Sequence, residues 1–185
     1  MKITGGRSRG KTLVSLKGLE IRPTSSKVRE AVFNILGHDM TGIKVLDLFA
    51  GTGILGIEAL SRGAEAAVFM DKSDKAIKVI IKNLALCGYD DISRVLKRDL
   101  TVRSAFESLA AKGDFDLVFI DPPYRKGIIP PVLMMLSDCG ILSGRAFVVT
   151  ESSKNDPLPE RSGKLLLSDT RIYGETRIDI FRKEY

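Results

Sequence analysis

The sequence has little of the side-chain chemistry on which many enzymes depend. Its 185 residues include one histidine, two cysteines and no tryptophan. Cys87 and Cys139 are isolated, and neither has a second Cys or His at the spacing of metal ligands. A Ser-His-Asp or Cys-His mechanism would have to depend on His38 alone. We therefore expect buried, reduced thiols, no metal site and no catalysis by histidine.

Long apolar runs are also missing. No stretch approaches the length of a membrane span, and the N-terminus has no signal-peptide core. Hydrophobic residues make up 44% of the chain and charged residues 28%, an ordinary balance for a folded domain. The length suits one domain with its own core. These features predict a cytoplasmic, globular protein.

Positive charge is concentrated at one end of the chain. Residues 1–30 hold eight Lys or Arg against two Glu, so this segment carries the entire net charge of +6. Such a basic segment on a neutral body is typical of a polyanion partner, although a solvated arm without a partner would have the same composition. The candidate phosphate ligands are Arg7, Arg9, Lys11, Arg22, Lys27, Arg29 and Arg125.

Residues 1–42 are predicted to form a basic N-terminal extension to a main domain at 43–185. Glycines and brief alternation over 1–20 favour a small hairpin with mobile basic side chains. A helix then begins, with Ser25 or Ser26 as its N-cap, because apolar residues follow at helical spacing from Val28 to Leu36.

From Ile43 onward, strands alternate with helices, which is typical of an α/β fold with a doubly wound sheet. The predicted strands cover 44–50, 66–70, 92–97, 115–120 and 145–150, followed by a hairpin over 164–173 and 175–183. Residues 152–163 are predicted to form a loop. The pattern gives a Rossmann-like, mostly parallel, seven-stranded sheet with a C-terminal antiparallel hairpin.

A G-x-G-x-x-G sequence, from Gly51 to Gly56, follows the first strand and suits either a pyrophosphate or the methionine portion of S-adenosylmethionine. Asp71 ends the second strand, where it would accept ribose hydroxyls, and Asp99 follows the third, within reach of an adenine amine. Asp47, an acid inside the first strand, favours a cationic ligand. All three acids could instead be loop and cap residues. The candidate cofactor ligands are Asp47, Phe49, Gly51, Thr52, Gly53, Asp71, Lys72, Asp99 and Leu100.

The fourth strand stops abruptly in Asp121, Pro122, Pro123 and Tyr124. The prolines lack N–H donors and prevent further sheet pairing. The Asp121 carboxylate and Pro122 carbonyl could accept both hydrogens of a flat amine, and Tyr124 could stack on its ring, which is catalysis by positioning and electrostatics. A surface turn after a buried strand is the structural alternative. These four residues are the candidate catalytic site.

This turn resembles the D/N-P-P-Y/F signature of S-adenosylmethionine-dependent methyltransferases that act on amino nitrogens. Together with 45–53, Asp71 and Asp99, it resembles the successive motifs of class I methyltransferases. The stretches 4–10, 22–36 and 173–176 resemble the RsmD family, which methylates guanine N2 in bacterial small-subunit ribosomal RNA. Ser26 stands where that family usually has Asp.

The resemblance implies S-adenosylmethionine as the cofactor, 16S ribosomal RNA in an assembling or assembled small subunit as the partner, and a monomer. Three other readings remain open. The same turn could act on adenine N6 in a nucleic acid or on a glutamine amide in a protein. A protein of a different class, a non-catalytic RNA-binding assembly factor, could also keep a methyltransferase scaffold.

Overall fold

The computed structural model describes residues 1–16, 25–107, 109, 114–123 and 127–184. Residues Arg22, Tyr124 and Arg125, which the sequence singled out, lie outside this part of the chain. Its elements, in chain order, are α1 (Ser26–Leu36), β1 (Lys44–Leu48), α2 (Ile54–Ser61), β2 (Ala66–Asp71), α3 (Asp74–Cys87), the 3₁₀ helix η1 (Asp90–Ile92), β3 (Ser93–Lys97), α4 (Ser104–Glu107), β4 (Phe115–Ile120), α5 (Ile129–Asp138), β5 (Leu142–Ser153), β6 (Arg161–Ser162), β7 (Leu165–Tyr173) and β8 (Thr176–Lys183).

One sheet runs through the molecule in the strand order β3-β2-β1-β4-β5-β8-β7-β6. Strands β1 to β5 are parallel, whereas β8, β7 and β6 add antiparallel to the edge beyond β5. This confirms the predicted Rossmann-like fold and its C-terminal hairpin. The strand order reverses between β1 and β4, which is the point where open α/β sheets bind ligands.

The sheet has eight strands, where the sequence predicted seven. The additional strand is β6, which lies inside the stretch predicted to be a loop. Its two residues pair with Leu165 and Leu166 of β7. Strand β5 is also longer than predicted and continues to Ser153 because it pairs with β8 along seven residues. The extension of β5 arises from pairing with a strand that is distant in sequence, whereas β6 forms a two-residue hairpin pairing with the start of β7.

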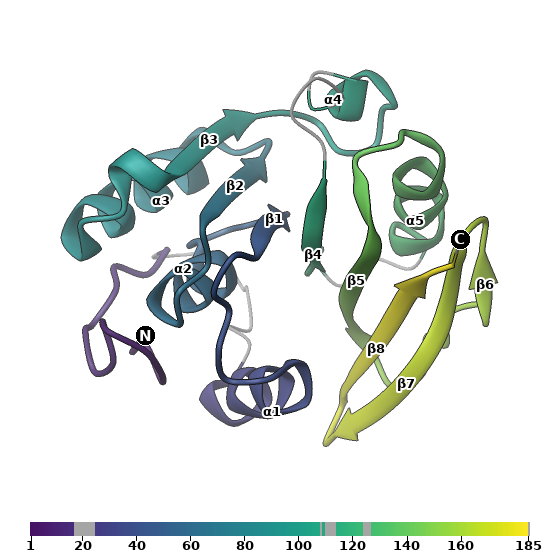
Figure 1. The fold of residues 1–185 in the computed structure, drawn as a ribbon, viewed down its shortest axis with the longest axis horizontal. Helices are drawn as coiled ribbons and strands as arrows, with labels where there is room; N and C mark the ends of the chain where they lie inside the picture. The colour runs from purple at the N-terminus through teal and green to yellow at the C-terminus, as the bar shows by residue number, and fades with distance from the viewer. Residues whose placement is uncertain (17–24, 108, 110–113, 124–126, 185) are drawn as a thin grey trace.

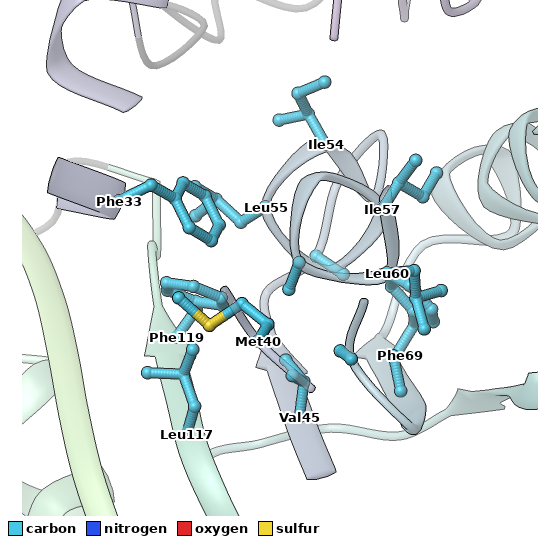
Figure 2. Close-up of a cluster of buried hydrophobic side chains, with 14 of the residues drawn as sticks. Phe33, Met40, Val45, Ile54, Leu55, Ile57, Leu60, Phe69, Leu117 and Phe119 are labelled. Atoms are coloured by element: carbon cyan, nitrogen blue, oxygen red, sulfur yellow. The ribbon is translucent and has the colours of Figure 1, made fainter. Parts of the chain in front are cut away.

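Two apolar layers cover the faces of the sheet. Side chains from α1, α2 and α3 pack on one face, and those from α4 and α5 pack on the other, as the arrangement in Figure 1 shows. In the first layer, the ring of Phe33 on α1 lies beside Leu55 of α2 and over Phe119 of β4 (Figure 2). The centroids of the Phe33 and Phe119 rings are 5.8 Å apart. Helix α1 therefore belongs to the core of the domain.

Local capping follows the sequence closely. The hydroxyl of Ser25 accepts a hydrogen bond from the backbone N–H of Val28, so Ser25 is the N-cap of α1. Ser73 caps α3 in the same way, and Gly88 ends that helix in the left-handed conformation.

Both cysteines are free; Cys87 is buried as predicted, whereas Cys139 is only half-buried. Among the described residues, no helix is both long and apolar enough to cross a membrane.

The backbone of the N-terminal segment is docked on the domain, while its basic side chains Arg7, Arg9 and Lys11 lie at the surface. The predicted hairpin is reduced to one bridge between Lys2 and Thr12, and Ile3 is buried in the first apolar layer. The segment lies against the end of α2, where the backbone N–H of Arg7 donates to the Ser61 carbonyl over 2.8 Å. Gly6 makes this approach possible, since a Cβ at that position would overlap the same carbonyl.

Candidate active site

The glycine loop after β1 turns sharply through left-handed backbone conformations. Phe49, Gly51 and Gly53 have φ angles of 57°, 57° and 77°. Positive φ is costly for a residue with a Cβ such as Phe49 and tends to occur at functional sites. Gly53 is also the N-cap of α2 and leaves the cap without a side-chain acceptor. The first turn of α2 therefore lies at the carboxyl end of β1 without a side-chain cap.

Asp71 fastens this loop to the neighbouring strand. One carboxylate oxygen accepts the backbone N–H of Gly51 over 2.9 Å, and the other accepts that of Ser73 over 2.8 Å. The residue is half-buried, and its neighbour Lys72 is exposed. Asp71 therefore sets the position of the glycine loop at the sheet edge where the sequence predicted a ribose contact.

Asp47 lies below the loop and is only 1% exposed. Its Oδ2 accepts the backbone N–H of Gly56, in the first turn of α2, over 2.9 Å. Burial raises the pKa of Asp47 to about 8, because the hydrogen bond from Gly56 offsets only part of the desolvation and the nearby Asp71 adds repulsion. Asp47 is almost fully buried, and its predicted role toward a cationic ligand stays a prediction. Asp47 supports the loop from beneath.

Asp99 follows β3 and points to the surface. Its Oδ1 accepts both the backbone N–H and the hydroxyl of Thr101, over 3.0 and 2.7 Å. These hydrogen bonds hold the pKa of Asp99 below its usual value, so the carboxylate stays ionised. Leu100 beside it is 2% exposed and anchors the turn in the second apolar layer. Asp71 and Asp99 thus end two neighbouring strands on one side of the glycine loop.

Asn83 on α3 is a site residue that the sequence analysis missed. Its side-chain amide donates to the Thr52 carbonyl in the glycine loop over 2.9 Å and to the Val14 carbonyl over 3.1 Å. Its carbonyl oxygen accepts the backbone N–H of Val14 over 2.8 Å. Asn83 therefore joins the N-terminal segment to the loop. The available signal was a polar residue beside Ile80 and Leu84 on the apolar stripe of α3.

The residues of this half of the sheet edge suit S-adenosylmethionine. The glycine loop offers a close backbone approach, and carboxylates at the ends of β2 and β3 can accept ribose hydroxyls and an adenine amine. An acid at the end of the second strand also binds the ribose of dinucleotides, so Asp71 by itself fits either cofactor. The residues that would hold the cofactor are Phe49, Gly51, Thr52, Gly53, Asp71, Lys72, Asp99 and Leu100.

The turn after β4 lies beside the glycine loop, across the switch point. The backbone N–H of Asp121 approaches the Leu48 carbonyl at the end of β1, at 3.5 Å. Asp121 is half-buried, Pro122 is buried and Pro123 is exposed. A narrow pocket beneath the turn is lined by Val32, Leu55, Phe119, Asp121, Glu151 and Ile178, among others. These residues come from α1, α2, β4, β5 and β8, so distant parts of the chain build the pocket.

The basic residues predicted to contact phosphates, where the structure describes them, are of two kinds, exposed and buried. Arg7, Arg9, Lys11 and Lys27 are exposed. The guanidinium of Arg7 lies 4.5 Å from the centre of the Tyr89 ring, and its Nε donates to the Tyr89 hydroxyl over 3.3 Å. Such stacking orders the Arg7 side chain while leaving it accessible. These four cations remain candidates for phosphate contacts.

Arg29 does not remain a candidate. It is 1% exposed, its Nε is 3.2 Å from a Glu58 carboxylate oxygen, and it donates to the Lys2 carbonyl over 2.6 Å. The prediction that Arg29 contacts phosphates is therefore wrong, because its side chain is used inside the protein. Burial lowers the pKa of Arg29, and the neighbouring Glu58 carboxylate opposes that shift.

Glu58 on α2 is the centre of this buried cluster and was also missed. Its carboxylate accepts the backbone N–H and hydroxyl of Thr4, over distances of 2.9 and 2.7 Å, and pairs with both Arg29 and Arg62. Glu58 is fully buried, but Arg29 and Arg62 balance its charge and Thr4 donates hydrogen bonds to it. A single acid in the otherwise apolar helix Ile54–Ser61 was the signal that could have identified it.

The sheet order, the glycine loop and the Asp-Pro-Pro turn at the switch point define a class I methyltransferase. A solved structure of yhhF, a proposed methyltransferase from Escherichia coli, superimposes with a TM-score of 0.84 at 34% identity, over 100% of this chain and 98% of that chain. Residues 1–182 match the family described as Conserved hypothetical protein 95, and the chain belongs to that family. This membership confirms the resemblance to the RsmD family.

Two relatives carry ribosomal RNA in their names. YlbH of Bacillus subtilis, a proposed rRNA methyltransferase, is 34% identical over 183 residues, 99% of each chain. Ribosomal RNA small subunit methyltransferase D of Escherichia coli is 33% identical over 185 residues, which is 100% of this chain and 90% of that protein.

Proposed function

We propose that this protein transfers a methyl group from S-adenosylmethionine to the exocyclic N2 amine of a guanine in small-subunit (16S) ribosomal RNA. One observation carries the proposal: the amine-holding turn at Asp121 and Pro122 lies next to the glycine loop at the switch point of the sheet. Donor and acceptor sites are then neighbours. The family membership and the names of the relatives support ribosomal RNA as the substrate.

The chemistry assigned to the chain is positioning and proton handling. When bound, S-adenosylmethionine supplies an electrophilic methyl group on a cationic sulfur. The Asp121 carboxylate and the Pro122 carbonyl accept hydrogen bonds from the two N–H groups of the amine. These contacts direct the nitrogen lone pair toward the methyl group. As the nitrogen gains the methyl group it loses one proton, which the Asp121 carboxylate accepts. Tyr124, outside the described residues, is proposed to stack on the base.

The RNA is proposed to be held chiefly through its phosphates. The exposed cations Arg7, Arg9, Lys11 and Lys27 would supply salt-sensitive affinity with little sequence information, and Arg22 and Arg125 remain part of this proposal. The target guanine must leave its stack, at a cost of roughly a few kcal/mol. We propose that specificity comes from the preassembled RNA–protein particle and that a monomer acts on it in the cytoplasm. Efficient methylation of naked RNA fragments would contradict this requirement for a particle.

The test is methyl transfer from labelled S-adenosylmethionine to small subunits that lack the modification, followed by nucleoside mass spectrometry. Wild type should produce N2-methylguanosine. Asp121→Ala should lose activity by roughly 100- to 1000-fold, as expected when a preorganised polar contact to the reacting group is removed. Asp138→Ala, an exposed carboxylate on α5, is the matched control and should retain full activity.

The other outcomes separate the alternatives. Label in adenine or in protein would keep the chemistry of the turn and reject guanine as the target. Particle binding without any label, together with no S-adenosylmethionine binding by calorimetry, would establish a non-catalytic assembly factor.

A further inference from the structure

The outer face of α3 carries positive charge that the proposed function does not use. Lys75, Lys78 and Lys82 are all exposed and lie at positions i, i+3 and i+7 of the helix. This spacing puts them on one side of α3, along roughly 10 Å of its axis. The opposite side packs into the first apolar layer through buried residues such as Ile80 and Leu84. The three lysines therefore form one row that faces solvent.

The lysines of α3 outnumber its acids. Asp74 is the one acid among the residues of this helix, and it pairs with Lys97 of β3 over 2.7 Å. Lys78 and Lys82 are four positions apart, a spacing at which like charges destabilise an isolated helix. A polyanion bound along the row would offset this repulsion.

The charge of the folded body is unevenly distributed. Residues 72–82 hold four Lys and one Asp, which gives a net charge of +3. Residues 31–185 hold 21 charges of each sign, so the rest of the body carries −3. The neutral total of the body therefore conceals a positive face on α3. Positive charge gathered on one face is typical of surfaces that bind nucleic acid.

The N-terminal segment extends this row past the end of α3. The Nζ of Lys11 donates to the Leu86 carbonyl in the last turn of the helix over 3.4 Å, and Arg7 stacks on Tyr89 just beyond it. The segment is fixed there because the hydroxyls of Ser8 and Tyr89 are 2.7 Å apart. Five exposed cations thus make one surface, the α3 basic strip: Lys75, Lys78 and Lys82 of α3 with Arg7 and Lys11 of the N-terminal segment.

We propose that the α3 basic strip binds the phosphodiester backbone of the substrate RNA at a site separate from the target nucleotide. Helix α3 packs on β2 and β3, whereas Asp121 follows β4, two to three strands and roughly 10–14 Å away. The phosphates held by the strip therefore belong to nucleotides other than the target. Lysine ammonium groups contact phosphates without reading sequence, so the strip orients the particle and leaves the choice of base to the active site. This inference rests on the proposed function for the identity of the RNA.

A triple variant of α3 tests the assignment. Lys75→Gln, Lys78→Gln and Lys82→Gln are combined, and binding to small subunits that lack the modification is measured across salt concentrations. The slope of log affinity against log salt should fall by roughly 2, because each lost phosphate contact removes about 0.7–0.9. Affinity near physiological salt should fall by roughly 10-fold or more. In methyl transfer, KM for the particle should rise while kcat stays unchanged, since neither the turn nor the glycine loop is altered.

A second triple variant is the matched control. Arg145→Gln, Lys164→Gln and Arg182→Gln remove the same charge from exposed positions near the other end of the sheet, on or beside β5, β7 and β8. This variant should keep the salt slope of wild type. Gln is a good helix former, so the α3 variant should fold, and wild-type affinity for S-adenosylhomocysteine verifies it.

The outcomes separate this inference from the proposed function. Unchanged binding by the α3 variant, or an equal fall in slope for the control variant, would overturn the inference. Weaker binding with an unchanged slope would also overturn it, because it would indicate a protein partner on the exposed side chains of Ile81 and Leu86. If the α3 variant shows the reduced slope but wild type methylates no guanine, the proposed function fails and the strip remains an RNA-binding surface.

Discussion

The two halves of the carboxyl edge are built in different ways. In the cofactor half, Asp47, Asp71 and Asp99 accept backbone N–H groups from residues between two and 20 positions away. In the acceptor half, Asp121 and Glu151 share a pocket with residues of α1 and β8, which are distant in sequence. The acids of the first half bind backbone groups within 20 positions, with Asn83 as its long-range contact, and the second half is held by tertiary packing.

This difference separates two kinds of requirement. A cofactor of fixed shape needs acceptors on rigid turns, and short-range hydrogen bonds to backbone supply them. Helix α1 forms a wall beneath the Asp-Pro-Pro turn, where Val32 lines the narrow pocket and the ring of Phe33 packs on Phe119 of β4. That wall depends in turn on Glu58, which ties α1 and the N-terminal segment to α2. A substitution of Glu58 should therefore disturb the acceptor half more than the cofactor half.

The largest expected effect is on stability, from Glu58→Gln. This variant leaves the buried Arg29 guanidinium without its carboxylate partner, which costs about 3–5 kcal/mol of unfolding free energy. Denaturant unfolding measures the loss. Under conditions where the variant remains folded, particle binding should weaken more than S-adenosylhomocysteine binding.

Glu175→Gln is the control for Glu58→Gln, because it removes the carboxylate of an exposed ion pair. Glu175 pairs with Lys154 over 2.6 Å, but the two side chains are 60% and 39% exposed. Such a pair contributes about 1 kcal/mol or less. Equal destabilisation by the two variants would show that Glu58 is not the tie between α1 and α2.

The next largest effect is expected from Asp71→Ala, which acts on the cofactor half. The variant removes the acceptor for the N–H groups of Gly51 and Ser73 and the proposed ribose contact. Calorimetry should show S-adenosylhomocysteine binding weakened by roughly 100-fold, about the cost of two hydrogen bonds to a charged group. Particle binding should not change. Asp91→Ala, an exposed residue of η1 just before β3, is the control, and equal weakening there would reject the assignment.

The same division explains what the sequence could predict. The glycine loop, Asp71 and the Ser25 and Ser73 caps depend on residues near them in the chain, and pattern located them. Glu58 and Asn83 contact partners from other elements, so local pattern showed only a polar residue in an apolar element. Arg29 was misassigned for the same reason, since composition records a cation but not its burial. The eighth strand, β6, is only two residues long and pairs with the start of β7, which is too short a stretch for an alternating pattern to show.

A smaller effect is expected on the pH dependence of the unfolding free energy, through Asp47. Its pKa is raised to about 8 in the folded protein, so between pH 4 and 8 the unfolded chain loses a proton that the folded chain keeps. Stability from this group therefore falls as pH rises, by about 1.4 kcal/mol per pH unit. Asp47→Asn cannot ionise and should gain stability relative to wild type by roughly 2 kcal/mol between pH 5.5 and 7. Denaturant unfolding across that range measures it, and parallel pH profiles would contradict the shift.

The smallest effects are expected from the exposed cations, and they test the surface on which the RNA rests. Arg9→Gln and Lys27→Gln should each weaken particle binding only a few-fold and reduce the slope of log affinity against log salt by roughly 0.7–1. Arg29→Gln should lower stability yet leave that slope unchanged in the folded variant, because the buried guanidinium releases no counterion. A reduced slope in Arg29→Gln would mean that α1 opens when RNA binds and that Arg29 exchanges Glu58 for a phosphate. The salt slope thus decides whether the buried cluster holds the acceptor half together throughout the reaction or opens to take part in it.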